Sequence, residues 1–86
     1  MVTVRRFYEE VGRRLRQARL RAELTQQELA DVVELSRASI ANIEGGRQPF
    51  AVHTLALCAR ALDVPVSELI PGAEWIDSET ELPAEV

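Results

Sequence analysis

The first 22 residues alternate apolar and polar positions with the period of an α-helix. At about 100° per residue, the apolar positions of this segment fall within an arc of about 80° and form one stripe. The stripe consists of Val4, Phe7, Val11, Leu15, Ala18 and Ala22. We therefore expect a helix that is capped by Thr3 and ends near Ala22, with Arg19 on the flank of its apolar stripe.

The segment Leu24–Arg47 predicts two shorter helices joined by a tight turn. Within it, Thr25 and Glu28 form a T-x-x-E capping box, in which each side chain bonds the backbone N–H of the other residue. This box starts the first short helix at Gln26. Apolar residues then recur at helical spacing and face inward, namely Leu29, Ala30 and Val33.

The second short helix begins after Ser36, whose hydroxyl suits an N-cap, and ends at the pair Gly45-Gly46. Its inward residues are Ile40 and Ile43. When these two face the core, the opposite face is small or polar and carries no acid. That face consists of Arg37, at its edge, and of Ala38, Ala41, Asn42 and Gly45.

A fourth helix is expected after the loop at Gln48-Pro49, because proline disfavours a helical conformation in the residue before it. The helix runs from about Ala51 to Leu62. Its predicted buried face consists of Val52, Leu55, Ala56, Ala59 and Leu62. Ala51 has no side-chain oxygen that could cap the helix, so we expect its first turn to fray.

The C-terminal part of the chain predicts a short fifth helix and an acidic tail. Pro65 suits the first position of a helix, in which Leu69 and Ile70 face the core or a partner. Residues 73–86 are acidic and lack periodicity, which is typical of a mobile tail. The pattern therefore predicts an all-α fold, with five helices in one domain at residues 1–72 and a short tail behind it.

Charge is distributed unevenly along the 86 residues. The whole chain has a net charge of −4 and a pI near 4.9, which by itself argues against nucleic acid as a partner. Residues 1–60, however, hold all ten arginines and seven acids, whereas residues 61–86 hold seven acids and no basic residue. The basic part contains the two short helices, so the overall acidity does not exclude a nucleic-acid partner for them.

Several classes of protein are disfavoured by the composition. No apolar run approaches the roughly 18 residues that span a membrane, and no secretory signal is recognisable at the N-terminus. Cys58 is the sole cysteine and cannot form an internal disulfide, so we expect a cytoplasmic protein. His53 is the sole histidine and has no thiol or acid at ligand spacing. Neither a metal site, a cofactor nor enzyme activity is therefore expected.

The segment from Gln26 to Arg47 resembles the helix-turn-helix of the Cro/repressor-type (Xre-family) transcription regulators. The matching residues are Gln26, Glu28, Leu29, Ala30, Val33, Leu35, Ile40 and the run Ile43-Glu44-Gly45-Gly46-Arg47. The resemblance extends from about Gly12 to Pro71. It implies a lambda-repressor-like DNA-binding fold, with the motif at residues 25–45 and helix 36–45 in the major groove of DNA.

The outward face of helix 36–45 holds the candidates for base recognition. Arg37 can donate two hydrogen bonds to guanine O6 and N7, and Asn42 can pair with adenine N6 and N7 or with a phosphate. Ala38 and Ala41 can contact thymine methyl groups. We predict that these four residues determine the sequence preference.

Further residues of the motif are candidates for contacts to the DNA backbone. The resemblance implies that Gln26 bonds a phosphate and supports Arg37, and the free backbone N–H groups at the start of its helix also favour an anion there. Gln27 is a looser candidate. Arg47 matches a basic position that the family uses on the DNA backbone, and Ser36 is a candidate both for capping and for a phosphate contact.

Glu44 ends the recognition helix with an acid, which the negative end of the helix dipole destabilises by about 0.3–1 kcal/mol. The resemblance implies a structural ion pair with Arg19, and the flank position of Arg19 agrees with it. Glu23 and Glu34 stand where family members often have glycine. A non-glycine residue in a left-handed conformation costs roughly 1 kcal/mol, so these turns either differ in shape or tolerate strain.

The resemblance also favours a homodimer, which would place two recognition helices about one turn of DNA apart. We predict a dimer interface that includes Leu69, Ile70 and Trp75. The leading hypothesis is a sequence-specific regulator, a dimeric repressor or autoregulator that binds double-stranded DNA.

Two alternatives stay open at this point. The chain could be an antitoxin or a restriction–modification controller whose acidic tail binds a protein partner. It could also be a helix-turn-helix that no longer binds DNA, although Gln26, Arg37 and Asn42 argue against this. Removal of residues 73–86 distinguishes the antitoxin from the regulator. If the shortened chain loses a protein partner but still binds DNA, the antitoxin hypothesis is favoured.

Overall fold

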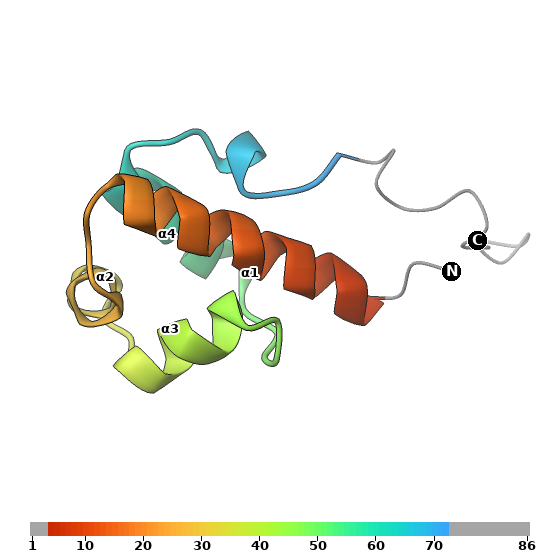
Figure 1. Cartoon of the computed structure of the whole chain (residues 1–86), viewed down its shortest axis with the longest axis horizontal. Coiled ribbons are helices and arrows are strands. Elements are labelled where there is room, and N and C mark those ends of the chain that lie inside the picture. Colours follow the sequence, from red (N-terminus) through yellow and green to blue (C-terminus); the bar gives the residue numbers. More distant parts are fainter. Residues whose placement is uncertain (1–3, 73–86) are drawn as a thin grey trace, which may run out of the picture.

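The structure, a computed structural model, describes residues 4–72 (Figure 1). Its elements are α1 (Val4–Arg21), α2 (Gln26–Val33), α3 (Arg37–Glu44), α4 (Val52–Leu62) and one turn of 3₁₀ helix, η1 (Val66–Glu68). The long helix α1 crosses the domain, with α4 behind it and α2 and α3 below it in the view of Figure 1. Residues 4–72 contain no β-strand, and the all-α prediction is confirmed.

The predicted fifth helix is wrong in kind, because the segment forms only the single turn η1. Glu68 N donates to Pro65 O at 3.0 Å and Leu69 N donates to Val66 O at 2.9 Å, which is the i→i+3 pattern of a 3₁₀ turn. A helix this short is unfavourable to nucleate. The turn instead directs Leu69 into the core, where its side chain is fully buried.

One hydrophobic core joins all four α-helices and the residue after η1. Its buried side chains are Val11, Leu15, Ala18, Leu29, Ala30, Val33, Ile40, Ile43, Leu55, Cys58, Ala59, Leu62 and Leu69. Every inward residue predicted for α2 and α3 belongs to this core. The packing of the two short helices therefore follows the periodicity of their sequence.

The apolar stripes predicted for α1 and α4 extend further than the core does. Val4 is 75% exposed, because α1 projects beyond the shorter helices at its N-terminal end (Figure 1). Ala22 lies after the last residue of α1 and is also exposed. In α4, Val52 and Ala56 are exposed whereas Cys58 is buried. Periodicity identifies the apolar face of a helix but not how much of that face a neighbour covers.

Side-chain caps begin both short helices where the sequence predicts them. Thr25 Oγ1 accepts from Glu28 N at 3.0 Å, and Glu28 Oε1 accepts from Thr25 N at 2.8 Å, which completes the capping box. Ser36 Oγ accepts from Ser39 N at 3.0 Å at the start of α3. By contrast, Ala51 makes no side-chain cap at the start of α4.

The turns around α2 keep the left-handed backbone although they contain no glycine. Glu23 and Glu34 both have φ of 58°, and Asp63, after α4, has φ of 56°. A left-handed conformation costs a non-glycine residue roughly 1–2 kcal/mol. The two glutamates therefore tolerate strain rather than change the shape of the turns.

The approach of α1 to α3 depends on Gly12, a buried residue in the middle of α1. A methyl group at this position would overlap the backbone carbonyl oxygens of Ile43 and Glu44. The last turn of α3 thus lies directly against the backbone of α1, which fixes where α3 is held.

Candidate nucleic-acid interface

Helix α3 presents to solvent the face that the sequence pattern assigns to it. Arg37 and Ala38 are exposed and Ala41 and Asn42 are half-buried, while the two isoleucines of the helix pack in the core. This face contains one cationic and one amide side chain and no acid. The alanine side chains at its centre are small enough for the backbone of α3 to approach another surface closely.

The single acid of α3, Glu44, is turned away from this face and into the protein. Its carboxylate accepts from Arg19 Nε at 2.6 Å and from Arg19 Nη2 at 3.0 Å, and Arg19 Nη1 also donates to Leu24 O at 2.8 Å. The side chains of Arg19 and Glu44 are only 7% and 2% exposed. Removing one partner of such a buried pair typically costs about 3–5 kcal/mol, so the pair fixes α3 firmly on α1.

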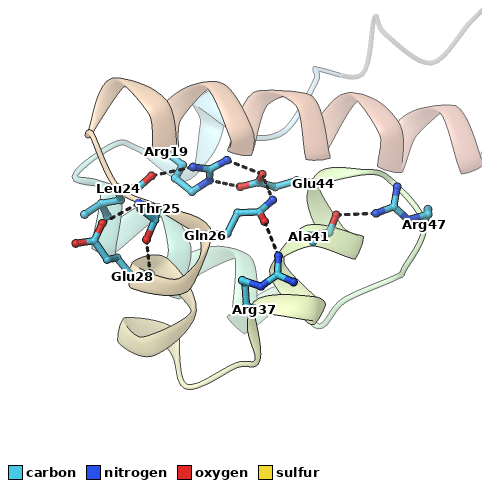
Figure 2. Close-up of polar contacts among 9 residues, drawn as sticks. All are labelled: Arg19, Leu24, Thr25, Gln26, Glu28, Arg37, Ala41, Glu44 and Arg47. Carbon is cyan, nitrogen blue, oxygen red and sulfur yellow. Dashed lines mark hydrogen bonds and ion pairs between the residues drawn. The ribbon is translucent and has the colours of Figure 1, made fainter.

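Gln26 connects the buried ion pair with the exposed face of α3 (Figure 2). Its Nε2 donates to Glu44 Oε1 at 3.1 Å, and its Oε1 accepts from Arg37 Nη1 at 3.4 Å. The four side chains of Arg19, Glu44, Gln26 and Arg37 thus form a continuous chain from the interior to the surface. Gln26, at the first position of α2, lies directly beside Arg37, at the first position of α3.

Arg47 folds back onto the C-terminal end of α3 (Figure 2). Its Nε donates to Asn42 Oδ1 at 3.2 Å and its Nη2 donates to Ala41 O at 3.2 Å. A cation is favourable at this end of a helix because the negative end of the helix dipole lies there. Arg47 and Asn42 therefore lie together, and the amide oxygen of Asn42 faces a group that can only donate.

Comparison with known families gives the class of the chain. The family model of the helix-turn-helix domain matches residues 10–69. The chain belongs to the helix-turn-helix domain family. The described motif, α2 and α3 with the turn between them, lies entirely within the matched residues.

Relatives of this helix-turn-helix chain include two repressors. It is 37% identical over 73 residues to the competence pilus inhibition repressor of Acinetobacter baylyi, covering 85% of this chain and 66% of that protein. It is also 37% identical over 71 residues to the immunity repressor protein of Bacillus phage phi105, covering 83% of this chain and 49% of that protein. The chain thus spans about two thirds and half of these relatives.

A solved structure shares the fold over most of this chain. The restriction-modification controller protein C.AhdI from Aeromonas hydrophila superposes with a TM-score of 0.70 at 30% identity. The match covers 73% of this chain and 96% of that one. The helix-turn-helix arrangement described above is therefore shared by a protein of known structure.

Gln27 and Ser36, two candidates for the DNA backbone, bond within their own helices. Gln27 Nε2 donates to Asp31 Oδ1 at 2.7 Å along the exposed side of α2. Ser36 Oγ caps α3 and also bonds Ser39 Oγ at 3.0 Å. Neither Gln27 nor Ser36 takes part in the hydrogen-bonded series of side chains that includes Gln26 and Arg37.

A second basic residue lies near Arg47 across a cleft of about 440 Å³ between the first turns of α1 and the loop after α3. Arg5 lines this cleft together with Arg47, and its Nε lies 3.5 Å from Glu9 Oε2. Arg5 is not among the candidates that the sequence pattern indicated for DNA contact. The periodicity of α1 carries no signal for the loop that lies beside it.

The cysteine of the described residues, Cys58, is buried. Burial and the nearby negative charge of Glu44 raise the pKa of the Cys58 thiol to about 11, which keeps it protonated at neutral pH. No group of three or more His, Cys, Asp or Glu side chains in residues 4–72 is arranged to hold a metal ion. No helix of this part is long and apolar enough to cross a membrane.

Proposed function

We propose that this chain is a sequence-specific DNA-binding regulator of transcription, a homodimeric repressor that inserts α3 into the major groove. The observation that carries the proposal is the acid-free outward face of α3, with Arg37 at its first position and Glu44 turned inward by Arg19. In helix-turn-helix proteins the second helix of the motif meets base edges through its N-terminal residues. The similarity to two repressors supports repression rather than toxin neutralisation.

Four residues of α3 have chemistry suited to bases. Arg37 offers a planar fork of donors to guanine O6 and N7, and such a bidentate contact discriminates by about 1–3 kcal/mol. Arg47 donates to the amide oxygen of Asn42, so the group that Asn42 can offer to DNA is its NH₂, which suits an acceptor such as N7, O6 or a phosphate. Ala38 and Ala41 leave room for thymine methyl groups.

Other residues would contact the phosphates on either side of these bases. Gln26 and Gln27 lie at the start of α2 and Ser36 at the start of α3, where free backbone N–H groups favour an anion. Arg47 would add a cation at the other end of α3. Contacts of this kind position the protein on DNA without selecting a sequence.

A dimer would present two copies of α3 to half-sites about 10 base pairs apart. Of the three residues predicted for its interface, Leu69 is fully buried and is therefore a core residue. Ile70 is 36% exposed and is kept in the proposal, while Trp75 lies outside the described residues. The proposal involves no catalysis and no cofactor, and it places the protein with the DNA, in the cytoplasm.

Selection of bound DNA from a random pool by the purified full-length protein tests this function. We expect an enriched motif made of two inverted half-sites about 10 base pairs apart, with a guanine facing Arg37. A pool without enrichment after repeated rounds would contradict a sequence-specific role. A single unrepeated half-site would support base recognition and contradict the dimer.

A further inference from the structure

We propose that Glu44 is a positioning residue for DNA specificity, in addition to its part in the ion pair. It holds the Gln26 amide in one orientation, and that amide in turn orients Arg37 for its base. The proposal rests on the function proposed above and assigns a role to a buried residue that cannot itself reach DNA. The geometry on which it stands is the chain of contacts from Arg19 to Arg37 (Figure 2).

The orientation of the Gln26 amide follows from the chemistry of its two neighbours. An ionised carboxylate only accepts hydrogen bonds and a guanidinium only donates them. The NH₂ group of Gln26 must therefore face Glu44, at 3.1 Å, and its oxygen must face Arg37, at 3.4 Å. The reversed amide would place oxygen against carboxylate and NH₂ against guanidinium. Glu44 thereby determines which end of the amide reaches the surface.

Burial and the contacts with Arg19 hold the Glu44 carboxylate in a fixed position. Its side chain is 2% exposed and is held by two bonds from Arg19, at 2.6 Å and 3.0 Å, so it has little freedom to turn. Charges removed from water are screened less by salt than exposed ones. Because Glu44 has little freedom to turn, its carboxylate holds the NH₂ group of the half-buried Gln26 in place. The oxygen of Gln26 in turn contacts the exposed Arg37.

The consequence concerns what Arg37 can recognise. One of its N–H groups is engaged by Gln26, and the remaining donors of the fork stay available for a base. A long side chain that is already oriented loses less conformational freedom on binding than a free one. The fixed direction of the donors then favours guanine, whose two acceptors match the fork. Release of the Gln26 amide would weaken this preference more than it weakens binding to DNA in general.

The main test compares two variants that both damage the ion pair. The measured quantity is the specificity ratio, the Kd for the selected duplex with the base pair facing Arg37 changed, divided by the Kd for the selected duplex itself. In Glu44→Gln the new amide can also donate, so Gln26 can reverse. In Arg19→Lys the two-pronged contact is lost, but a cation remains and Glu44 stays an acceptor. We expect the ratio to fall about tenfold in Glu44→Gln and to stay near wild type in Arg19→Lys.

An equal fall in both variants would overturn the proposal, because it would mean that the ion pair acts only by holding α3 in place. Melting followed by circular dichroism comes first, so that each variant is measured well below its own Tm. In the double variant Glu44→Gln/Gln26→Met, the fall should be no larger than in Gln26→Met alone. Additive falls would show that the two residues act separately and would overturn the relay.

A second variant keeps the proposal testable if Glu44→Gln does not fold. Gln26→Glu keeps both residues of the ion pair and gives Arg37 a stronger acceptor, but its carboxylate repels Glu44. The relay predicts a reduced specificity ratio for Gln26→Glu, whereas simple support of Arg37 by residue 26 predicts an unchanged or higher one. A wild-type protein without any sequence preference would overturn the proposed function together with the relay. A wild-type preference that Gln26→Glu retains overturns the relay alone.

Discussion

Arg37 and Arg47 sit at opposite ends of α3 and differ in what already occupies their donors. Arg37 is exposed and makes one long contact, 3.4 Å to Gln26. Arg47 makes two contacts of 3.2 Å to α3 itself, one of them to a backbone carbonyl. In the proposed complex with DNA, Arg37 would therefore read a base, whereas Arg47 would add positive charge beside the DNA backbone.

We therefore expect Arg37→Ala and Arg47→Ala to weaken DNA binding in different ways. Arg37→Ala should lower affinity for the selected site by about 1–3 kcal/mol and relax preference at one base pair, with little change on random DNA. Arg47→Ala should weaken binding to both and reduce the salt slope by about one. Fluorescence anisotropy over a series of salt concentrations measures both quantities. Equal losses by both variants on both DNAs would contradict this division of roles.

The thiol of Cys58 should be nearly inert in the folded protein. Burial, and then the negative charge of Glu44, raise its pKa to about 11 from an ordinary value of 9.0. The reactive thiolate is therefore scarce below pH 11 and becomes common only above it. The rate of alkylation should be at least about a hundredfold lower in buffer at pH 8 than in denaturant. Comparable rates in the two conditions would show that α4 opens readily.

Among the elements, the helix starts were predicted better from the sequence than the extent to which neighbouring elements cover each helix. The caps at Thr25 and Ser36 act between residues three apart, so the sequence alone was enough to place the starts of α2 and α3. The exposure of Val4 and the reduction of the fifth helix to η1 depend on which neighbours cover a segment, which periodicity does not encode. The contact between Gln26 and Glu44 joins residues that are 18 positions apart, and no spacing rule indicates it.

Gly12 gives a prediction in which packing opposes helix propensity. Gly→Ala within an exposed helix normally stabilises by about 1 kcal/mol. Here the methyl group would overlap two carbonyl oxygens of α3, so we expect Gly12→Ala to destabilise the fold by about 1–3 kcal/mol. Urea denaturation followed by circular dichroism measures the change. Gln17→Ala, at an exposed position of α1, is the matched control and should change stability by less than about 0.5 kcal/mol. A stabilised Gly12→Ala variant would contradict the close approach of α1 and α3.

The start of α4 is the element end that is easiest to improve. Ala51 already has the extended backbone of an N-cap, with φ of −72° and ψ of 149°, but no side chain that can accept a hydrogen bond. Ala51→Ser should add a bond to Thr54 N and stabilise the fold by about 1 kcal/mol, and Ala51→Val should not. Thermal melting of the wild type, Ala51→Ser and Ala51→Val measures the difference in Tm. An equal Tm for Ala51→Ser and wild type would show that this turn frays regardless of its cap.

At the scale of the whole molecule, the net charge of −4 is distributed unequally. Residues 1–72 hold ten arginines and nine acids, whereas residues 73–86 hold five acids and no base. Electrostatic attraction to DNA acts over about a Debye length, which is roughly 8–10 Å near physiological salt and longer in dilute salt. The acids of residues 73–86 should therefore oppose DNA binding mainly at low ionic strength, without affecting which base pairs are preferred.

Replacement of these five acids by their amides in the full-length chain, at Glu74, Asp77, Glu79, Glu81 and Glu85, tests this effect. Affinity for selected and random duplexes should rise together, by severalfold near 20 mM salt, and the gain should vanish above about 300 mM. The specificity ratio at the base pair facing Arg37 should not change, because the replaced charges are common to both measurements. A loss of affinity instead would mean that residues 73–86 contribute to the dimer or to the complex. In that case the acidic segment would belong to the binding machinery rather than to its electrostatic surroundings.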